Sequence, residues 1–205
     1  MIKENYITSS CIISNNIVHK NGTILFEDLK TDLPGFLTSA YHHFGFKYPK
    51  FYKMDNLAKL GWLAAELLLK DNFLQGKYAP AEVGVVLANA NSSLDTDLKY
   101  YETAKDIASP ALFVYTLPNI VIGEICIRHN FKGENAFFIF DNFDAGFIQQ
   151  YVSNLINSDI LQACICGWVE VLGDTYNTVL FLVQKNGSIP FTKENINKIY
   201  QLENG

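Results

Sequence analysis

The stretch Val83–Ala88, VGVVLA, is an unbroken apolar run of strand length in the middle of the chain. A strand covered on both faces has such a run, whereas a strand with one solvent-exposed face alternates between apolar and polar residues. The run therefore predicts a strand inside a parallel or mixed sheet that has helices on both faces.

Helices and strands alternate on either side of this run. Asp55 is a candidate N-cap, and the leucines that follow it recur at helical spacing up to Lys70. Residues 31–53 are turn-rich and aromatic, and they predict an ordered loop region. Further strands are predicted at 6–18, 23–26, 137–140, 161–171 and 178–183, and further helices at 94–106, 118–130, 144–157 and 192–202. This order predicts one α/β domain over residues 1–205.

Composition excludes several classes of protein. With 205 residues, of which 49% are hydrophobic, the chain can bury a sizeable core. The net charge of -5 and the absence of a nucleotide-binding glycine motif argue against nucleic acid and nucleotides as partners. No apolar run approaches the roughly 18 residues of a membrane span, and the N-terminus lacks the apolar core of a signal peptide. We therefore expect a cytoplasmic protein without a membrane span.

Several segments, in order, resemble the N-terminal half of β-ketoacyl-acyl-carrier-protein synthases. The run at Val83–Leu87 resembles the strand that follows the family's first long helix. The family's SP…F…LPN…G stretch is resembled by Ser109-Pro110, Phe113, Leu117-Pro118-Asn119 and Gly123. Its GPN turn is resembled by Gly133-Glu134-Asn135, and its strand ending in GG-x-E is resembled by Ala163–Glu170, ACICGWVE. The resemblance covers most of residues 1–185 and implies a thiolase-like half: a mixed, mostly parallel sheet with helices on both faces. In the whole fold two such halves form five layers, with central helices between two sheets.

The family's catalytic groups have no counterpart in this sequence. Its acylated cysteine lies three residues before a glycine, just after the strand that follows the GPN turn. Here the glycine is Gly146 and the matching residue is Phe143, which cannot form an acyl-enzyme. No cysteine occurs in residues 136–150, and the family's catalytic histidines come from its second half, which this sequence does not contain. We therefore expect no intrinsic 3-oxoacyl synthase activity, no catalytic residue and no cofactor.

Other chemically active side chains have structural explanations. Cys164 and Cys166 would face the same side of a strand, but no second pair completes a tetrahedral metal site. These two, with Cys11 and Cys126, are expected to be buried thiols, and the adjacent His42 and His43 are expected to be solvated or hydrogen-bonded. No metal site is therefore predicted. Asp141 and Asp144 flank the nucleophile position, either as an acid–base pair or, for one of them, as a helix cap.

Two surfaces are candidates for contact with partners. Lys47, Lys50, Lys53 and Lys59 form a basic stretch in an acidic chain, and the first three are a candidate docking patch for an acyl carrier protein, which is acidic in the resembled family. A solvated lysine face is the alternative. The apolar residues Phe137, Phe138, Ile139 and Phe140 are a candidate dimer interface, because the family's corresponding strand pairs across a two-fold axis.

These observations support two hypotheses. The first is a non-catalytic ketosynthase-like subunit of a fatty-acid, polyketide or aryl-polyene type pathway. It would pair with itself or with a full-length synthase, or bind an acyl carrier protein. The alternative is an enzyme of altered chemistry that processes acyl thioesters through Asp141, Asp144 or a cysteine, although no activating histidine is identified for it.

Overall fold

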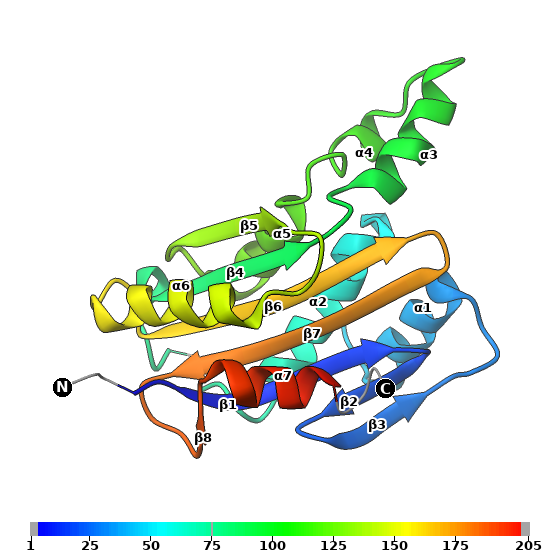
Figure 1. Ribbon diagram of the computed structural model, residues 1–205. Coiled ribbons are helices and arrows are strands. Elements are labelled where there is room, and N and C mark those ends of the chain that lie inside the picture. The colour runs from blue at the N-terminus through cyan, green and yellow to red at the C-terminus, as the bar shows by residue number, and fades with distance from the viewer. Residues whose placement is uncertain (1–3, 75, 202–205) are drawn as a thin grey trace.

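The chain forms a mixed eight-stranded sheet with helices on both faces (Figure 1). The computed structural model describes residues 4–74 and 76–201. The strands lie in the order β3-β2-β1-β7-β6-β4-β5, and β8 pairs with β1. Their bounds are β1 Tyr6–Ser14, β2 Ile17–Lys20, β3 Thr23–Glu27, β4 Val83–Asn89, β5 Asn135–Ile139, β6 Ala163–Leu172, β7 Thr175–Gln184 and β8 Ile189–Pro190. The predicted mixed sheet with helices on both faces is confirmed, but its strand pairs are mostly antiparallel rather than mostly parallel.

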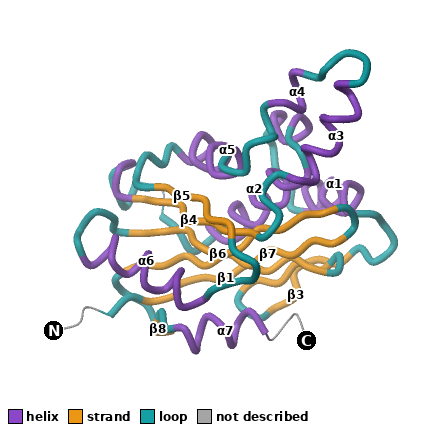
Figure 2. Tube along the Cα trace, turned by 45° about the horizontal axis from the view of Figure 1, so that its top comes forward, coloured by secondary structure: helices purple, strands orange, loops and turns teal. Residues whose placement is uncertain are grey.

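The helices divide between the two faces of the sheet (Figure 2). Their bounds are α1 Leu33–His43, α2 Asn56–Leu69, α3 Leu94–Ala104, α4 Pro110–Phe113, α5 Ile120–His129, α6 Ala145–Asn157 and α7 Lys193–Gln201, with short 3₁₀ helices at Pro49–Lys53 and Pro80–Glu82. Helices α1, α2 and α5 contribute to the core on one face, and α6 and α7 contribute to the core on the other. The predicted end of the last helix at Leu202 lies outside the described residues.

Strand β4 carries the pattern that the sequence predicted. All of its residues are buried, and it pairs in parallel with both β5 and β6. Val85 and Leu87 face the α2 side, whereas Val86 and Ala88 face the α6 side. The other strand pairs are antiparallel, so parallel pairing is confined to β4 and its two neighbours.

Helix α2 is the main helix of the first core. Asp55 caps it as predicted, because its carboxylate accepts a hydrogen bond from the Ala58 amide at 2.8 Å. Every residue from Leu57 to Leu69 except Lys59 is buried. Each fully buried leucine contributes about 1.5–3 kcal/mol relative to an exposed one. A Cβ at Gly61 would collide with Val121, so this glycine permits the close packing of α5 on α2.

Two sequence predictions about the first third of the chain are wrong. Residues 31–53 are not a loop but contain α1 and a 3₁₀ helix. Pro34 suits the first turn of α1, where no amide partner is required, and Asp32 caps that turn through the Gly35 amide at 2.9 Å. The β-rich stretch 6–18 is not continuous, because Asn15 and Asn16 adopt positive φ values of 50° and 59° between β1 and β2.

In the whole fold of the resembled family, the helix after the nucleophile position lies between two sheets, and this chain was expected to supply only part of that covering. The described residues form a single sheet, and α6 lies on its surface. Its inner stripe, Ala145, Ile148, Val152 and Ile156, is buried, while Gln150 and Asn154 are exposed. Helix α7 packs beside α6 over the same face of the sheet.

Helices α3 and α4 project away from the body as an arm, defined here as residues 94–117 (Figure 1). The arm begins after β4 and returns to the body at Pro118. None of the described helices is both long and apolar enough to cross a lipid bilayer.

Candidate functional site

The residue that the resemblance matches to the family's nucleophile, Phe143, lies just before α6. Phe143 precedes Asp144, whose carboxylate caps the helix by accepting a hydrogen bond from the Phe147 amide at 2.9 Å. The Phe143 ring is half-buried, with its centroid 6.1 Å from that of Trp168 and 4.7 Å from that of Tyr200. An aromatic cluster from the segment before α6, from β6 and from α7 therefore occupies the place where the resemblance puts a thiol.

The carboxylates and cysteines near this position are poorly suited to catalysis. Asp144 is used as the helix cap, which was one of its two predicted roles, and Asp141 is exposed. Cys164 and Cys166 are fully buried on β6, and burial raises the pKa of both thiols. Burial also raises the pKa of Cys126, to about 11. These thiols are protonated at neutral pH and are therefore poor nucleophiles.

A buried carboxylate, to which the sequence analysis gave no role, organises the carboxyl end of β4. Glu170, the last residue of the ACICGWVE segment, accepts hydrogen bonds from the amides of Ala90 and Asn91 at 2.6 and 3.2 Å. The Asn91 side chain donates a third bond to it at 3.2 Å. These bonds fix the loop that leads from β4 into the arm. The segment that signalled the resemblance thus contains a residue that positions a loop.

The base of the arm is attached to the body by hydrogen bonds of buried side chains. The Thr96 hydroxyl donates to Asp55 at 2.6 Å, and the Gly173 amide donates to Asp95 at 3.0 Å. The Ser93 hydroxyl donates to the Thr116 carbonyl at 2.8 Å and so joins the two ends of the arm. Burial raises the pKa of Asp55.

The predicted lysine patch is only partly available for a partner. Lys47 and Lys53 are exposed. Lys50 instead forms an ion pair of 2.7 Å with Glu124, whose side chain is buried and also accepts a hydrogen bond from Tyr115. Lys50 therefore neutralises a buried carboxylate, which the sequence could not show because the two residues are distant along the chain.

The two predicted loop histidines lie at the end of α1. Both are exposed, and Nε2 of His42 lies 3.2 Å from the Tyr52 hydroxyl. Within residues 4–74 and 76–201, no group of three or more histidine, cysteine, aspartate or glutamate side chains is placed to hold a metal ion.

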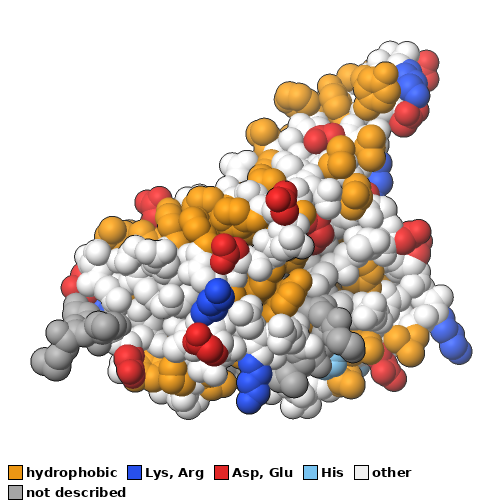
Figure 3. All heavy atoms as spheres, viewed as in Figure 1, with side chains coloured by type: hydrophobic (Ala, Val, Ile, Leu, Met, Phe, Trp, Pro, Cys, Tyr) orange, Lys and Arg blue, Asp and Glu red, His pale blue; other side chains and the backbone are white. Residues whose placement is uncertain are grey.

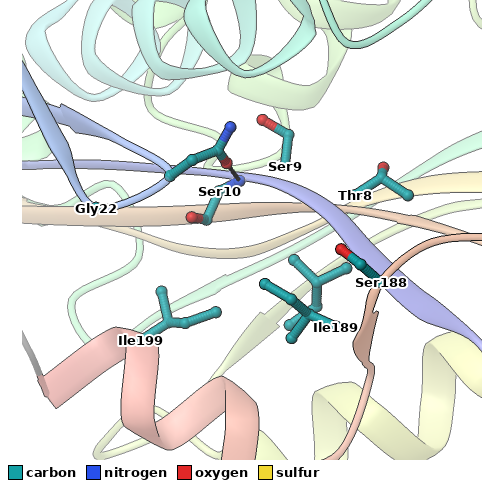
Figure 4. Close-up of a pocket in the computed structure, with 9 residues that line it drawn as sticks. Thr8, Ser9, Ser10, Gly22, Ser188, Ile189 and Ile199 are labelled. Atoms are coloured by element: carbon teal, nitrogen blue, oxygen red, sulfur yellow. Dashed lines mark hydrogen bonds between the residues drawn. The ribbon is translucent and has the colours of Figure 1, made fainter.

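A cavity of about 380 Å³ lies between β1, the turn after β2, the segment around β8 and α7 (Figure 4). Ile7, Ser10, Ser188, Ile189 and Ile199 are among the residues that line it, and none of its lining residues is charged. Figure 4 shows Ser9 on the opposite side of β1 from Ile199. Phe143 is not among the lining residues. The cavity therefore offers apolar and hydroxyl contacts, and no histidine, cysteine, lysine or carboxylate is among its lining residues to activate a hydroxyl.

Apolar side chains gather at the β5 edge of the sheet and along the arm (Figure 3). β5 is an edge strand, because it pairs with β4 on one side only. Ile139 is 49% exposed, and Phe137, Phe138 and Phe140 are half-buried. The ring of Phe138 also contacts the rings of Phe147 and Tyr151 on α6, at centroid distances of 4.8 and 5.1 Å.

Solved structures of ketosynthases share the fold of this chain. No family model and no curated protein matches the chain. Among solved structures, the chain is similar to the ishigamide ketosynthase/chain length factor, with a TM-score of 0.62 and 15% identity over 88% of this chain and 62% of the other.

Two further solved structures have the same fold. One is the complex of a type II polyketide synthase acyl carrier protein with its ketosynthase, AntDE:AntF (TM-score 0.61, 14% identity, 90% of this chain and 63% of the other). The other is the ketosynthase ApeO in complex with its chain length factor ApeC from Xenorhabdus doucetiae (TM-score 0.59, 9% identity, 90% of this chain and 80% of the other). The chain spans about three fifths of the length of the first two. At these identities the similarity establishes a common fold.

Proposed function

We propose that this chain is a non-catalytic ketosynthase-like subunit that pairs through β5 with a full-length ketosynthase in a polyketide- or fatty-acid-type pathway. The observation that carries the proposal is the combination of an aromatic ring at the nucleophile position with an open apolar strand edge. One feature removes the chain's own condensation chemistry, and the other provides a surface for a partner.

The edge strand supports pairing on physical grounds. An exposed, apolar strand edge presents unpaired amide and carbonyl groups and invites another strand, so soluble proteins normally cover or charge it. β5 carries no charged residue between Asn135 and Ile139. Two of the structural neighbours are named as a ketosynthase with a chain length factor, which supports a partner of this same fold.

Binding of an acyl carrier protein is a second part of the proposal. One neighbour is named as a ketosynthase in complex with its acyl carrier protein. On this chain the exposed Lys47 and Lys53 remain candidates for contacts with an acidic carrier protein, whereas Lys50 is paired within the chain.

The alternative, an enzyme of altered chemistry, receives less support. It requires an activated carboxylate or thiolate. The cysteines are buried with raised pKa values, and Asp144 is used as a cap. Intact-mass spectrometry after incubation with an acyl thioester would detect the covalent adduct that a thiol or carboxylate nucleophile requires.

Pairing is tested by mixing the purified chain with a full-length ketosynthase from the same organism and measuring the mass by light scattering. We expect a one-to-one complex, weakened at least about tenfold by Ile139→Lys because a lysine there must be desolvated on pairing. Ile160→Lys is the matched control, because Ile160 is 53% exposed in the turn after α6. If the native chain and its variants all remain separate from the ketosynthase, the proposal is overturned. If the chain forms a homodimer that excludes the ketosynthase, the partner is a second copy of this chain.

A further inference from the structure

The arm rises past the sheet edge that β5 forms, in both views of the backbone (Figures 1 and 2). A strand added to β5 would therefore lie alongside the arm. The arm leaves the body at Leu94, directly beyond the carboxyl end of β4, which is the strand paired with β5. Its position places it close to a subunit that extends the sheet beyond β5.

The surface of the arm is unusually apolar for an exposed segment. Seven of the sixteen exposed large hydrophobic side chains of the described residues belong to it: Leu94, Leu98, Tyr101, Ile107, Phe113, Val114 and Leu117. The first three recur at i, i+4 and i+7, so they share one face of α3. Exposed apolar surface concentrated in this way marks an interaction site.

The arm is also held in a fixed direction. The Ser93–Thr116, Thr96–Asp55 and Gly173–Asp95 hydrogen bonds fix its base. Further out, the rings of Tyr100 and Phe113 pack with their centroids 5.5 Å apart and join α3 to the segment that returns from the tip. A segment that is ordered before binding loses less conformational entropy when a partner covers it.

The surface area that a stable interface requires shows whether β5 alone could hold a partner. A stable interface removes about 800 Å² from each partner, or roughly 20–30 residues a side. β5 offers the outer edge of five residues, which is far short of that size. The arm, with residues 94–117, lies on the same side of the molecule and exposes further apolar surface beyond that of β5.

We infer that the arm is a clamp that lies across the ketosynthase-like subunit paired with β5, with the Leu94–Leu98–Tyr101 face of α3 against an apolar surface of that subunit. This inference rests on the proposed pairing and deepens it by assigning most of the binding surface to the arm. Residues 94–117 contain four acidic residues and two lysines, a net charge of -2, so the partner surface around the apolar contact is expected to be neutral or basic.

The test is a binding titration of the full chain with the ketosynthase. The variant Leu98→Lys/Tyr101→Lys replaces side chains that are 56% and 65% exposed, so we expect it to fold with an unchanged melting temperature. Its dissociation constant should rise at least about tenfold, as for central interface residues. The matched control, Leu29→Lys/Ile160→Lys, changes side chains that are 65% and 53% exposed outside the arm and should bind like the native chain.

A photo-crosslinking residue at position 107 gives a second readout, because Ile107 is 87% exposed near the tip of the arm. We expect crosslinks from this position to the ketosynthase and none from position 160. If Ile139→Lys abolishes pairing while the arm variant binds normally and position 107 gives no crosslink, the clamp is overturned and the pairing through β5 stands. If the native chain does not bind the ketosynthase, both are overturned.

Discussion

The outer face of α6 and the β5 edge are both at the surface, but they differ in chemistry. The exposed residues of α6 are polar, Gln150 and Asn154, and its apolar stripe is directed into the core. The β5 edge and the adjoining arm instead expose isoleucine, leucine and aromatic side chains. The outer face of α6 therefore presents a polar surface to solvent, whereas the β5 edge and the arm present an apolar surface that a protein partner could cover.

The last helix explains much of this difference. Ile196 of α7 and Phe191 just before it are buried against the α6 side of the sheet, and Tyr200 contacts Phe143. In the five-layer arrangement that the resemblance implied, a second sheet would cover this side. Here α6 and α7 cover the apolar residues of the sheet themselves.

A matched pair of truncations should show the largest contrast between the two sides. Ile196→Ala removes a fully buried side chain from the α6 side and should lower the free energy of unfolding by about 2–5 kcal/mol. Ile139→Ala removes a side chain that is 49% exposed at the β5 edge and should cost less than about 1 kcal/mol in the unpaired chain. Urea denaturation of both variants measures the difference; equal losses would contradict the contrast.

Acid should lower the stability of the contacts between α2 and α5, which belong neither to the outer face of α6 nor to the β5 edge. Burial favours the neutral form of Glu66, but the hydrogen bond and charge of His129, at 2.7 Å, together with Arg128, hold the pKa of Glu66 below its usual value. The resulting stabilisation is complete above the unfolded pKa of about 4.3 and is lost as the pH falls through the lower folded pKa.

Glu66→Gln should therefore cost about 1.5–3 kcal/mol near neutral pH and should flatten the loss of stability below about pH 4.3. Thermal melts of the native chain and the variant between neutral pH and pH 3 would show it. If the stability of the native chain and that of the variant fall in parallel as the pH is lowered, Glu66 does not contribute to the acid sensitivity.

Reversal of the two exposed lysines should have a smaller effect. Lys47→Glu/Lys53→Glu should weaken binding of an acyl carrier protein about threefold to tenfold at low salt, and less at high salt, because exposed charges are screened within roughly 10 Å at 0.1 M. The control is Lys193→Glu/Lys198→Glu on α7. Lys50→Glu should instead destabilise the fold by leaving Glu124 unpaired. If both double variants bind the carrier protein equally well, Lys47 and Lys53 do not form its docking patch.

The smallest effect is expected for Phe143→Cys, which should not change the condensation activity of the chain. The isolated chain should neither decarboxylate malonyl thioesters nor condense them with acyl thioesters, and Phe143→Cys should not create this activity. The new thiol would lie beside the Trp168 and Tyr200 rings without a group to manage protons. Product formation above a no-enzyme control, by either chain, would contradict this prediction.

Local patterns in the sequence predicted local structure well. The VGVVLA run gave the buried strand β4, and Asp55 and Asp144 both act as caps. Helix α1 was missed because residues 31–53 were interpreted as a turn-rich, aromatic loop, although Pro34 and Gly35 lie in the first turn of a helix. The predicted roles of Phe143 and of the β5 edge remain proposals.

Contacts between distant residues could not be predicted in this way. The Lys50–Glu124 ion pair, the packing of Tyr200 on Phe143 and the bonds from Glu170 to the loop after β4 join segments that only the fold brings together. The direction of the arm depends on three such contacts at its base. No periodicity within residues 94–117 contains that information.

Hydrogen exchange of the chain, alone and mixed with the ketosynthase, tests the difference between the two sides most directly. On pairing, the outward-facing amides of β5 should gain protection because they become hydrogen-bonded to the partner, while the exchange of α6 amides should not change. Protection that appears on α6 and not on β5 would mean that the partner covers the α6 side, and would contradict the account.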